Sequence, residues 1–310
     1  MKRFASLISG DSATRRGVLF MLLAVLSSTT IMAVIRYVSA DLHPFVMAFF
    51  RSLFGLMVFL PLFVKFGWMP LKTKRPGLHM VRGALQVVVM LGTFTALSLA
   101  PLAKVTALRF SGPLFATLLA LLILHEIIRA RRISAMIVGF SGAMIILRPG
   151  FVEIDLGALL ALAAAAAWAM NMIAIKSLSA TESSSTVTIY AVLVTTPATF
   201  LAALPFWQTP NWQEMLWLVL IGALGSLSHW SRAQAFKYAD ITVLLPIDFT
   251  ALVWAALFGY MIFGEVADVW TWLGGIVIFS STSYITYRER QVRTERKAGS
   301  PEPRGGSDTS

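Results

Sequence analysis

The chain has 310 residues, of which 57% are hydrophobic and only 13% are charged, and its mean hydropathy is +0.75. A soluble domain carries roughly 25% charged residues, so this composition excludes an ordinary water-soluble protein and predicts an exterior that faces lipid. The absence of cysteine excludes disulfides, thiolate catalysis and cysteine-based metal sites.

The formal net charge is +11, but it does not indicate a nucleic-acid partner. The basic residues stand in short clusters between apolar stretches, as in the loops of membrane proteins, where Lys and Arg mark the cytoplasmic side. We therefore expect a lipid bilayer, and no nucleic acid, as the environment of this chain.

Segments of about 20 mainly apolar residues, the length that crosses a bilayer, recur along the whole sequence. The first is longer than the apolar region of a signal peptide and is interpreted as an uncleaved helix. The expected spans are 17–37, 44–66, 79–99, 102–124, 132–148, 155–176, 187–206, 214–232, 241–263 and 270–287. The sequence thus predicts an all-α polytopic membrane protein of about ten transmembrane helices.

The basic residues orient these spans. With the N-terminus inside, the predicted outer loops hold only three of them, which are Arg36, Lys104 and Arg148. This bias predicts a multi-pass protein of the bacterial inner membrane with both termini cytoplasmic. Residues 1–16 are then a cytoplasmic segment. Residues 288–310, charged at first and then rich in Pro, Gly and Ser, form a disordered cytoplasmic tail.

Two stretches 139 positions apart resemble each other without a gap. They run from Ala96 to Glu126 and from Ala235 to Glu265, and each is a long apolar segment that ends in a lone Glu. Ala100 is matched by Ala239, and Phe110 by Phe249. The pattern predicts an internal repeat of five helices. Because five is odd, the second half is inverted relative to the first, an arrangement typical of secondary transporters.

These two repeated units resemble those of the drug/metabolite transporter superfamily, in its EamA-like branch. Two further segments are similar to that family: Phe49-Phe50-Arg51, and Arg148-Pro149-Gly150 at the end of the first half. The resemblance implies two inverted five-helix repeats, here 17–148 and 155–287, and alternating access around a central cavity. It implies a secondary transporter of a small organic metabolite such as an amino acid, carboxylate, vitamin or nucleotide-like solute. It does not indicate the solute, the direction of transport or the coupling ion.

Three ionisable residues lie well inside predicted spans, where a charge costs on the order of 2.5–3.5 kcal/mol. They are Arg51, Arg109 and Asp248. Arg51 either binds an anionic group of the solute or snorkels toward the interface. Arg109 and Asp248 are equivalent in the two repeats, so we expect them to form a buried pair, either one that the solute or a proton disturbs or a static one.

The remaining candidates are weaker. Glu126 and Glu265 end equivalent helices and have either a gating or a structural role. Gln86, Asn171, Tyr190 and Gln234 interrupt apolar helices and either orient a solute or bond across helices. Trp168, Phe110, Phe249 and Trp254 either line a cavity for a ring-bearing solute or serve packing.

The sequence does not indicate an enzyme. The four His are scattered and show no metal-ligand spacing, and there is no phosphate-binding loop for ATP. We expect no cofactor and no metal. The alternative function is a non-transporting membrane scaffold or a channel-like component, and the sequence leaves open whether the chain forms a homodimer.

Overall fold

A computed structural model describes residues 12–66, 73–122, 130–151, 153, 155–178, 181–182, 184–239 and 241–298. Within these ranges the chain forms twelve α-helices and one short 3-10 helix. The helices of the first half are α2 (Ser12–Val38), α3 (Pro44–Phe66), α4 (Pro76–Leu99), α5 (Leu102–Arg109), α6 (Gly112–Leu122) and α7 (Ala130–Leu147). Those of the second half are α8 (Leu156–Leu178), α9 (Ser184–Ala203), η2 (Leu204–Phe206), α10 (Trp212–Tyr238), α11 (Ile241–Asp248), α12 (Thr250–Phe263) and α13 (Val269–Ala298).

The helices begin and end where the local sequence demands it. Pro76 opens α4, since a missing amide proton costs nothing in the first turn. A capping box opens α10, in which Asn211 and Glu214 exchange side-chain to backbone hydrogen bonds. Gly264 closes α12 with φ +66°, a left-handed conformation that glycine adopts without strain.

The internal repeat is visible in the backbone. α4 ends at Ala100 and α10 ends at Ala239, both in extended conformation. The Ala100 amide donates to the Ala96 carbonyl at 2.9 Å, and the Ala239 amide donates to the Ala235 carbonyl at 3.0 Å. Positions 139 residues apart therefore have the same local structure, as the ungapped sequence match predicts.

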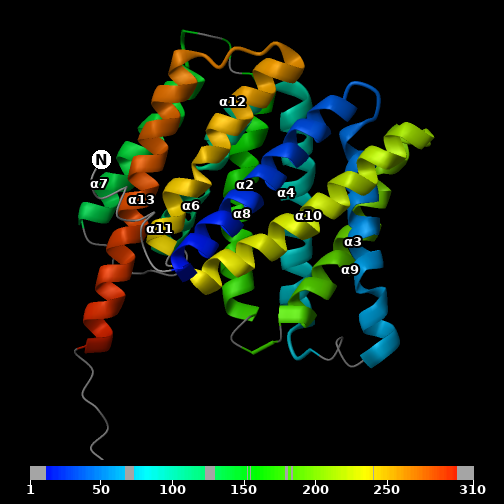
Figure 1. Ribbon diagram of the computed structural model, residues 1–310, viewed down its shortest axis with the longest axis horizontal. Coiled ribbons are helices and arrows are strands. Elements are labelled where there is room, and N and C mark those ends of the chain that lie inside the picture. The colour runs from blue at the N-terminus through cyan, green and yellow to red at the C-terminus, as the bar shows by residue number, and fades with distance from the viewer. Residues whose placement is uncertain are drawn as a thin grey trace, which may run out of the picture.

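The two repeats interlock. α2 of the first repeat packs along α10 of the second, and α8 of the second packs along α4 of the first (Figure 1). Glycines permit both contacts, because a Cβ on Gly17 would lie 2.5 Å from the Cβ of Ala239, and one on Gly157 would lie 2.7 Å from that of Ala100. The first helix of each repeat thus lies against the end of the third helix of the other.

α7 and α13, the last helices of the two repeats, pack against each other at one side of the bundle (Figure 1). Gly142 and Gly274 meet at this crossing, where a Cβ on Gly142 would lie 2.8 Å from the carbonyl oxygen of Gly274. Small residues let two backbones approach closely in a membrane, so these glycines set the spacing of the two helices.

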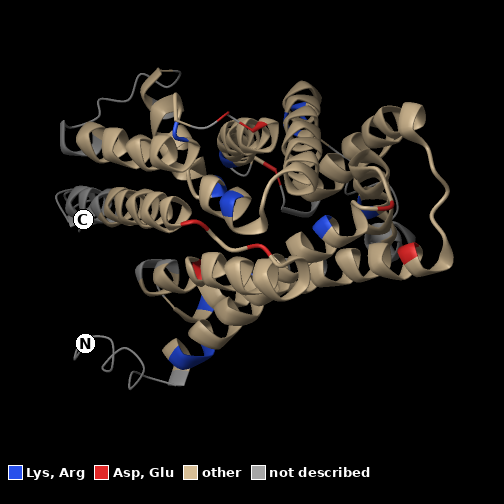
Figure 2. Ribbon diagram, turned by 90° about the horizontal axis from the view of Figure 1, so that it is seen from above, with Lys and Arg blue, Asp and Glu red and all other residues tan. Residues whose placement is uncertain are grey.

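The helices suit a bilayer. Six of those described are long and apolar enough to cross a membrane, and Pro44–Met57 and Ile133–Leu147 are shorter apolar helices. Most of the helical ribbon carries neither acidic nor basic residues, and many of the charges lie in loops and at helix ends (Figure 2). When α5 is counted with α6 and α11 with α12, the described residues form ten long helical segments, the number of spans that the sequence predicts.

Two details differ from the prediction. The spans expected at 102–124 and 241–263 are each broken into two helices. The tail expected to be disordered from residue 288 continues α13 as a helix to Ala298. Arg, Glu, Gln and Lys dominate residues 288–298 and have high helix propensity, which explains the extension. Residues 1–11 and 299–310 lie outside the described residues.

Candidate functional site

Both broken spans are interrupted at the equivalent residue. α5 ends at Phe110, with φ −66° and ψ −9°, and α12 begins after Phe249, with φ −67° and ψ −21°. Proline lies three positions from each break, as Pro113 after the first and Pro246 before the second. Because proline cannot donate to the preceding turn, it weakens the helix there. Both residues keep α-helical dihedrals, so each break is a local irregularity of the span and not an unwound segment.

Phe110 and Phe249 contact each other. Their ring centroids are 5.4 Å apart with an interplanar angle of 47°. Phe249 also stacks on Phe279 of α13, at 4.1 Å and 29°. When equivalent residues of two repeats touch, the pseudo-two-fold axis that relates the repeats passes between them. The aromatic group of Phe110, Phe249 and Phe279 therefore marks the interface of the two repeats.

Charged residues adjoin this aromatic group, but the pairing differs from the prediction. Asp248 pairs with Arg232 of α10, whose Nη1 lies 2.9 Å from Asp248 Oδ1. The predicted partner, Arg109, instead directs Nη1 toward the sulfur of Met32 at 3.4 Å, while Asp248 and Arg232 act on it electrostatically. Arg232 is the last residue of the predicted span 214–232, at its cytoplasmic end. In the structure α10 continues to Tyr238, because good helix formers follow Arg232.

Arg109 has an unusual environment. Its chain neighbours Leu108 and Ser111 are buried, whereas Arg109 itself is exposed. It is the last residue of α5, and α6 begins three positions later, at Gly112. The C-terminus of α5 carries a partial negative charge that favours a cation at Arg109, and the N-terminus of α6 carries a partial positive charge beside it.

Two other predicted residues lie on elements next to this group. Trp254 of α12 packs with Phe258, at 6.2 Å between ring centroids, and against a buried cluster that includes Met21 and Val25 of α2. Gln234 lies on α10 two residues after Arg232 and is half-buried.

The remaining predicted residues belong to other helix contacts. Arg51 lies on α3, where Nη1 is 3.1 Å from the sulfur of Met90 and the guanidinium stands over the Phe94 ring at 5.9 Å. α4 contributes both of these partners. The structure therefore places Arg51 in the packing of α3 against α4.

Three further candidates bridge helices. Asn171 of α8 is buried and donates to Gln86 of α4 at 2.7 Å, while its own side-chain oxygen has no hydrogen-bond partner among the described residues. Tyr190 of α9 stacks on the buried ring of His79 at 4.4 Å. Trp168 of α8 lies against Gly112 at the start of α6, where a Cβ would come within 2.8 Å of its ring.

Three ion pairs cross between the repeats at one end of the bundle. Lys104 pairs with Asp155 and Arg148 with Asp268, both at 2.6 Å, and Arg36 pairs with Glu265. Arg36, Lys104 and Arg148 are the three basic residues that the positive-inside pattern assigns to the outside. Each of these exceptions is thus neutralised by a carboxylate of the other repeat.

Glu265 has a structural setting that the sequence does not reveal. Its Oε2 accepts a hydrogen bond from the Leu102 amide at 2.9 Å, so the carboxylate caps the N-terminus of α5, where a negative charge is favourable. Arg36 in turn donates to the carbonyls of Leu97 and Ala100 at 2.6 and 2.9 Å. Glu126, the equivalent of Glu265, lies outside the described residues.

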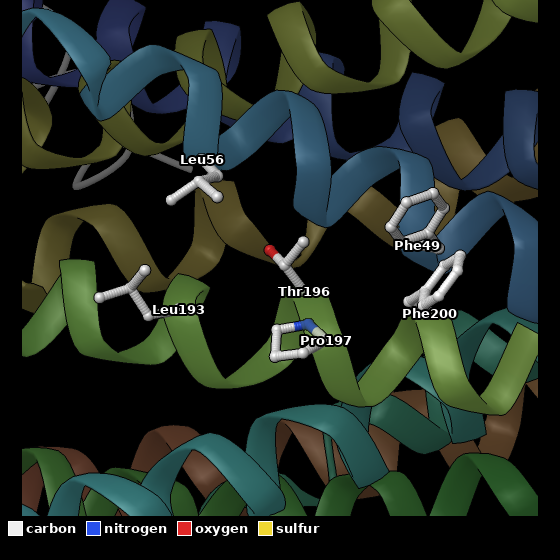
Figure 3. Close-up of a pocket in the computed structure, with 6 residues that line it drawn as sticks. All are labelled: Phe49, Leu56, Leu193, Thr196, Pro197 and Phe200. Carbon is white, nitrogen blue, oxygen red and sulfur yellow. The ribbon is translucent and has the colours of Figure 1, made fainter.

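An apolar groove of about 390 Å³ lies elsewhere, between α3 and α9 (Figure 3). Its lining residues are Phe49, Leu56, Leu193, Thr196, Pro197 and Phe200. The hydroxyl of Thr196 already donates to the Val192 carbonyl at 2.8 Å, so the lining of the groove is apolar. None of the predicted site residues lines it, and it has nothing to orient a polar solute, so the site between the repeats remains the candidate.

A family model for the EamA-like transporter family matches residues 15–148 and 155–287. This chain belongs to that family. The two matched regions coincide with the two structural repeats, and together they cover most of the chain. The family assignment makes the protein a membrane transporter of small metabolites and not an enzyme.

Relatives within this transporter family carry different names. The chain is 34% identical to a protein of Rickettsia bellii named S-adenosylmethionine uptake transporter, over 90% of this chain and 96% of the relative. It is 35% identical to a riboflavin transporter of Vibrio cholerae, over 91% and 96%. A pseudopaline exporter of Pseudomonas aeruginosa is 27% identical, over 85% and 93%. A protein of known crystal structure, 21% identical, aligns with a TM-score of 0.58 over 90% of this chain and 99% of its own, which supports the fold alone.

Proposed function

We propose that this transporter moves a metabolite with a fused heteroaromatic ring, by alternating access around the aromatic and charged groups at the repeat interface. The observation that carries the proposal is the contact of Phe110 with Phe249, two equivalent residues at two helix breaks. S-adenosylmethionine and riboflavin, which name two relatives, both contain a fused nitrogen heterocycle. Offset or tilted stacking on phenylalanine suits such a ring.

The ion pairs support alternating access. Arg36 with Glu265, Lys104 with Asp155 and Arg148 with Asp268 join the repeats at the predicted outer end. At the opposite end of α2, a pocket of about 300 Å³ lies between α2, α10 and α11, lined by Thr14, Phe236, Lys237, Tyr238, Ala239 and Val243. Ion pairs that join the repeats at the outer end, together with a pocket at the inner end, are consistent with an inward-facing state of a carrier.

The test is flux into proteoliposomes that contain the purified protein, with radiolabelled S-adenosylmethionine and riboflavin as probes. We expect saturable uptake of at least one probe, accelerated by unlabelled compound on the far side. Flux that rises linearly with concentration favours the channel-like alternative. If the uptake of a broader panel of ring-bearing metabolites does not exceed that of empty liposomes, the result favours the scaffold alternative.

We further propose that the chain lies in the bacterial inner membrane with both termini cytoplasmic. The distribution of Lys and Arg supports this orientation, because Arg36, Lys104 and Arg148 are the basic residues on the predicted outer side. The natural chain has no cysteine, so single cysteines can report topology without background. A membrane-impermeant maleimide should label Asn211→Cys in intact cells and Lys74→Cys only after lysis. The reverse labelling pattern would mean that the chain has the opposite orientation.

A homodimer remains a prediction, which light scattering in detergent would check.

A further inference from the structure

The charged group beside Phe110 and Phe249 is not electrically balanced. It comprises Arg109, Arg232 and Asp248, which are two guanidinium groups and one carboxylate. Asp248 uses Oδ1 to accept from Arg232, and both residues act electrostatically on Arg109. The three side chains therefore leave one positive charge uncompensated within the membrane-spanning bundle, where an unpaired charge is costly.

Arg109 carries that excess. A guanidinium has five N–H donors, and the acceptor that the described part of the chain gives Arg109 is the Met32 sulfur at 3.4 Å. A thioether is a weak acceptor and does not compensate a cation. The arginine is also exposed, so an incoming group can reach its remaining donors.

The positions around Arg109 favour an anion. α6 begins three positions later, at Gly112, and the partial positive charge of a helix N-terminus favours a negative charge there, while the amides of Leu114 and Phe115 donate to the Ser111 carbonyl. On the other side of the aromatic contact, Asp248 has Oδ2 without a hydrogen-bond partner among the described residues. One free cation and one free carboxylate oxygen thus flank the pair of phenylalanines.

We propose that the solute of this transporter carries a carboxylate that binds Arg109 and a cationic group that lies against Asp248, with its ring on Phe110 and Phe249. The substrate class is therefore an amino-acid-bearing heteroaromatic metabolite, and not a ring compound without a carboxylate such as riboflavin. This inference rests on the proposed function, since it assigns the substrate class of the same site. Hydrogen bonds between a guanidinium and a carboxylate are charge-assisted and bidentate, which gives both strength and selectivity.

The test compares two probes that differ only in the carboxylate, S-adenosylmethionine and its decarboxylated derivative, with riboflavin as the ring compound that lacks the group. Dissociation constants are measured on the purified wild type in detergent. We expect S-adenosylmethionine to bind on the order of 10- to 100-fold more tightly than the decarboxylated compound, the range of one charge-assisted interaction. The same comparison on Arg109→Gln should yield two nearly equal constants, and Arg109→Lys should retain part of the preference.

Arg75→Gln is the matched control, because Arg75 bonds to Ser177 in an exposed connection far along α4 from the site. It should keep the wild-type preference. If the wild type binds both adenosyl compounds equally, or binds riboflavin more tightly, the substrate class is wrong while the carrier proposal stands. If no ring-bearing probe binds or is transported, the proposed function itself fails. The comparison of probes on the wild type does not depend on whether any variant folds.

Discussion

Phe110 and Phe249 are equivalent residues of the two repeats, and their rings touch across the interface with centroids 5.4 Å apart. Their contact places the two helix breaks side by side, with Arg109 and Asp248 at the ends of the preceding helices. A rearrangement of one repeat against the other must therefore move this contact, which makes the two phenylalanines the most informative positions for mutation.

Phe110→Ala or Phe249→Ala should weaken the binding of a ring-bearing solute. An aromatic pair contributes about 0.5–1.5 kcal/mol beyond the area it buries, so we expect a loss of roughly tenfold in affinity, measured by titration of the purified protein. Phe151→Ala is the control, because Phe151 is 91% exposed. Equal affinity in all four proteins would show that the ring does not bind between the repeats.

Glu265→Gln should open the outer end. The change removes the charge that pairs with Arg36 and weakens the cap on the Leu102 amide. In a single-cysteine background with Thr106→Cys, a buried position of α5, an impermeant maleimide added outside should react several-fold faster. Glu214→Gln, at the capping box of α10 at the same end, should leave the rate unchanged. An unchanged rate with Glu265→Gln would mean that this ion pair does not limit outward opening.

Gly274→Ala should destabilise the bundle. The added Cβ would lie 2.4 Å from the carbonyl oxygen of Gly142, so α7 and α13 must separate, at a cost of about 1–3 kcal/mol. The same substitution at Gly225, where nothing lies within 4 Å of the added Cβ, should be neutral or stabilising by up to about 1 kcal/mol. Melting temperatures in detergent check the pair. Similar values for both variants would argue against the close crossing.

Glu182 provides a pH-dependent contact outside the spans. The hydrogen bond from the Thr73 hydroxyl, with a further one from the Lys74 amide, holds the pKa of Glu182 below its ordinary value of 4.5, although desolvation opposes them. A lowered pKa means that the contact stabilises the folded state above about pH 4.5 and is lost as the pH falls through the folded pKa. Because Glu182 lies in an exposed connection, the effect is small.

The measurement for this contact is the difference in melting temperature between the wild type and Glu182→Gln. The wild type should be slightly more stable at pH 6, and the difference should disappear near pH 3. A difference that grows on acidification would contradict the assigned sign.

The sequence alone determined the membrane class, the ten crossings, the repeat and the family. These properties depend on composition, on apolar stretches long enough to span a bilayer and on residue identities repeated 139 positions apart, all of which are local or linear. The pairing of Asp248 was not determined in this way. Positions 109 and 248 are equivalent in the two repeats, as the sequence predicts. Equivalent positions need not contact the same kind of side chain, however, so the repeat does not reveal the partner of either residue.

The tertiary structure decided the partners because the repeats interlock. α10 crosses α2 and continues past the predicted end of its span, which brings Arg232 within 2.9 Å of Asp248 and leaves Arg109 beside Met32. Likewise, no local pattern links Arg36 to Glu265, which are 229 positions apart in the chain. The cost of an unpaired charge in lipid can be inferred from the sequence, but only the packing of the two repeats shows which charged side chains meet a partner of opposite charge.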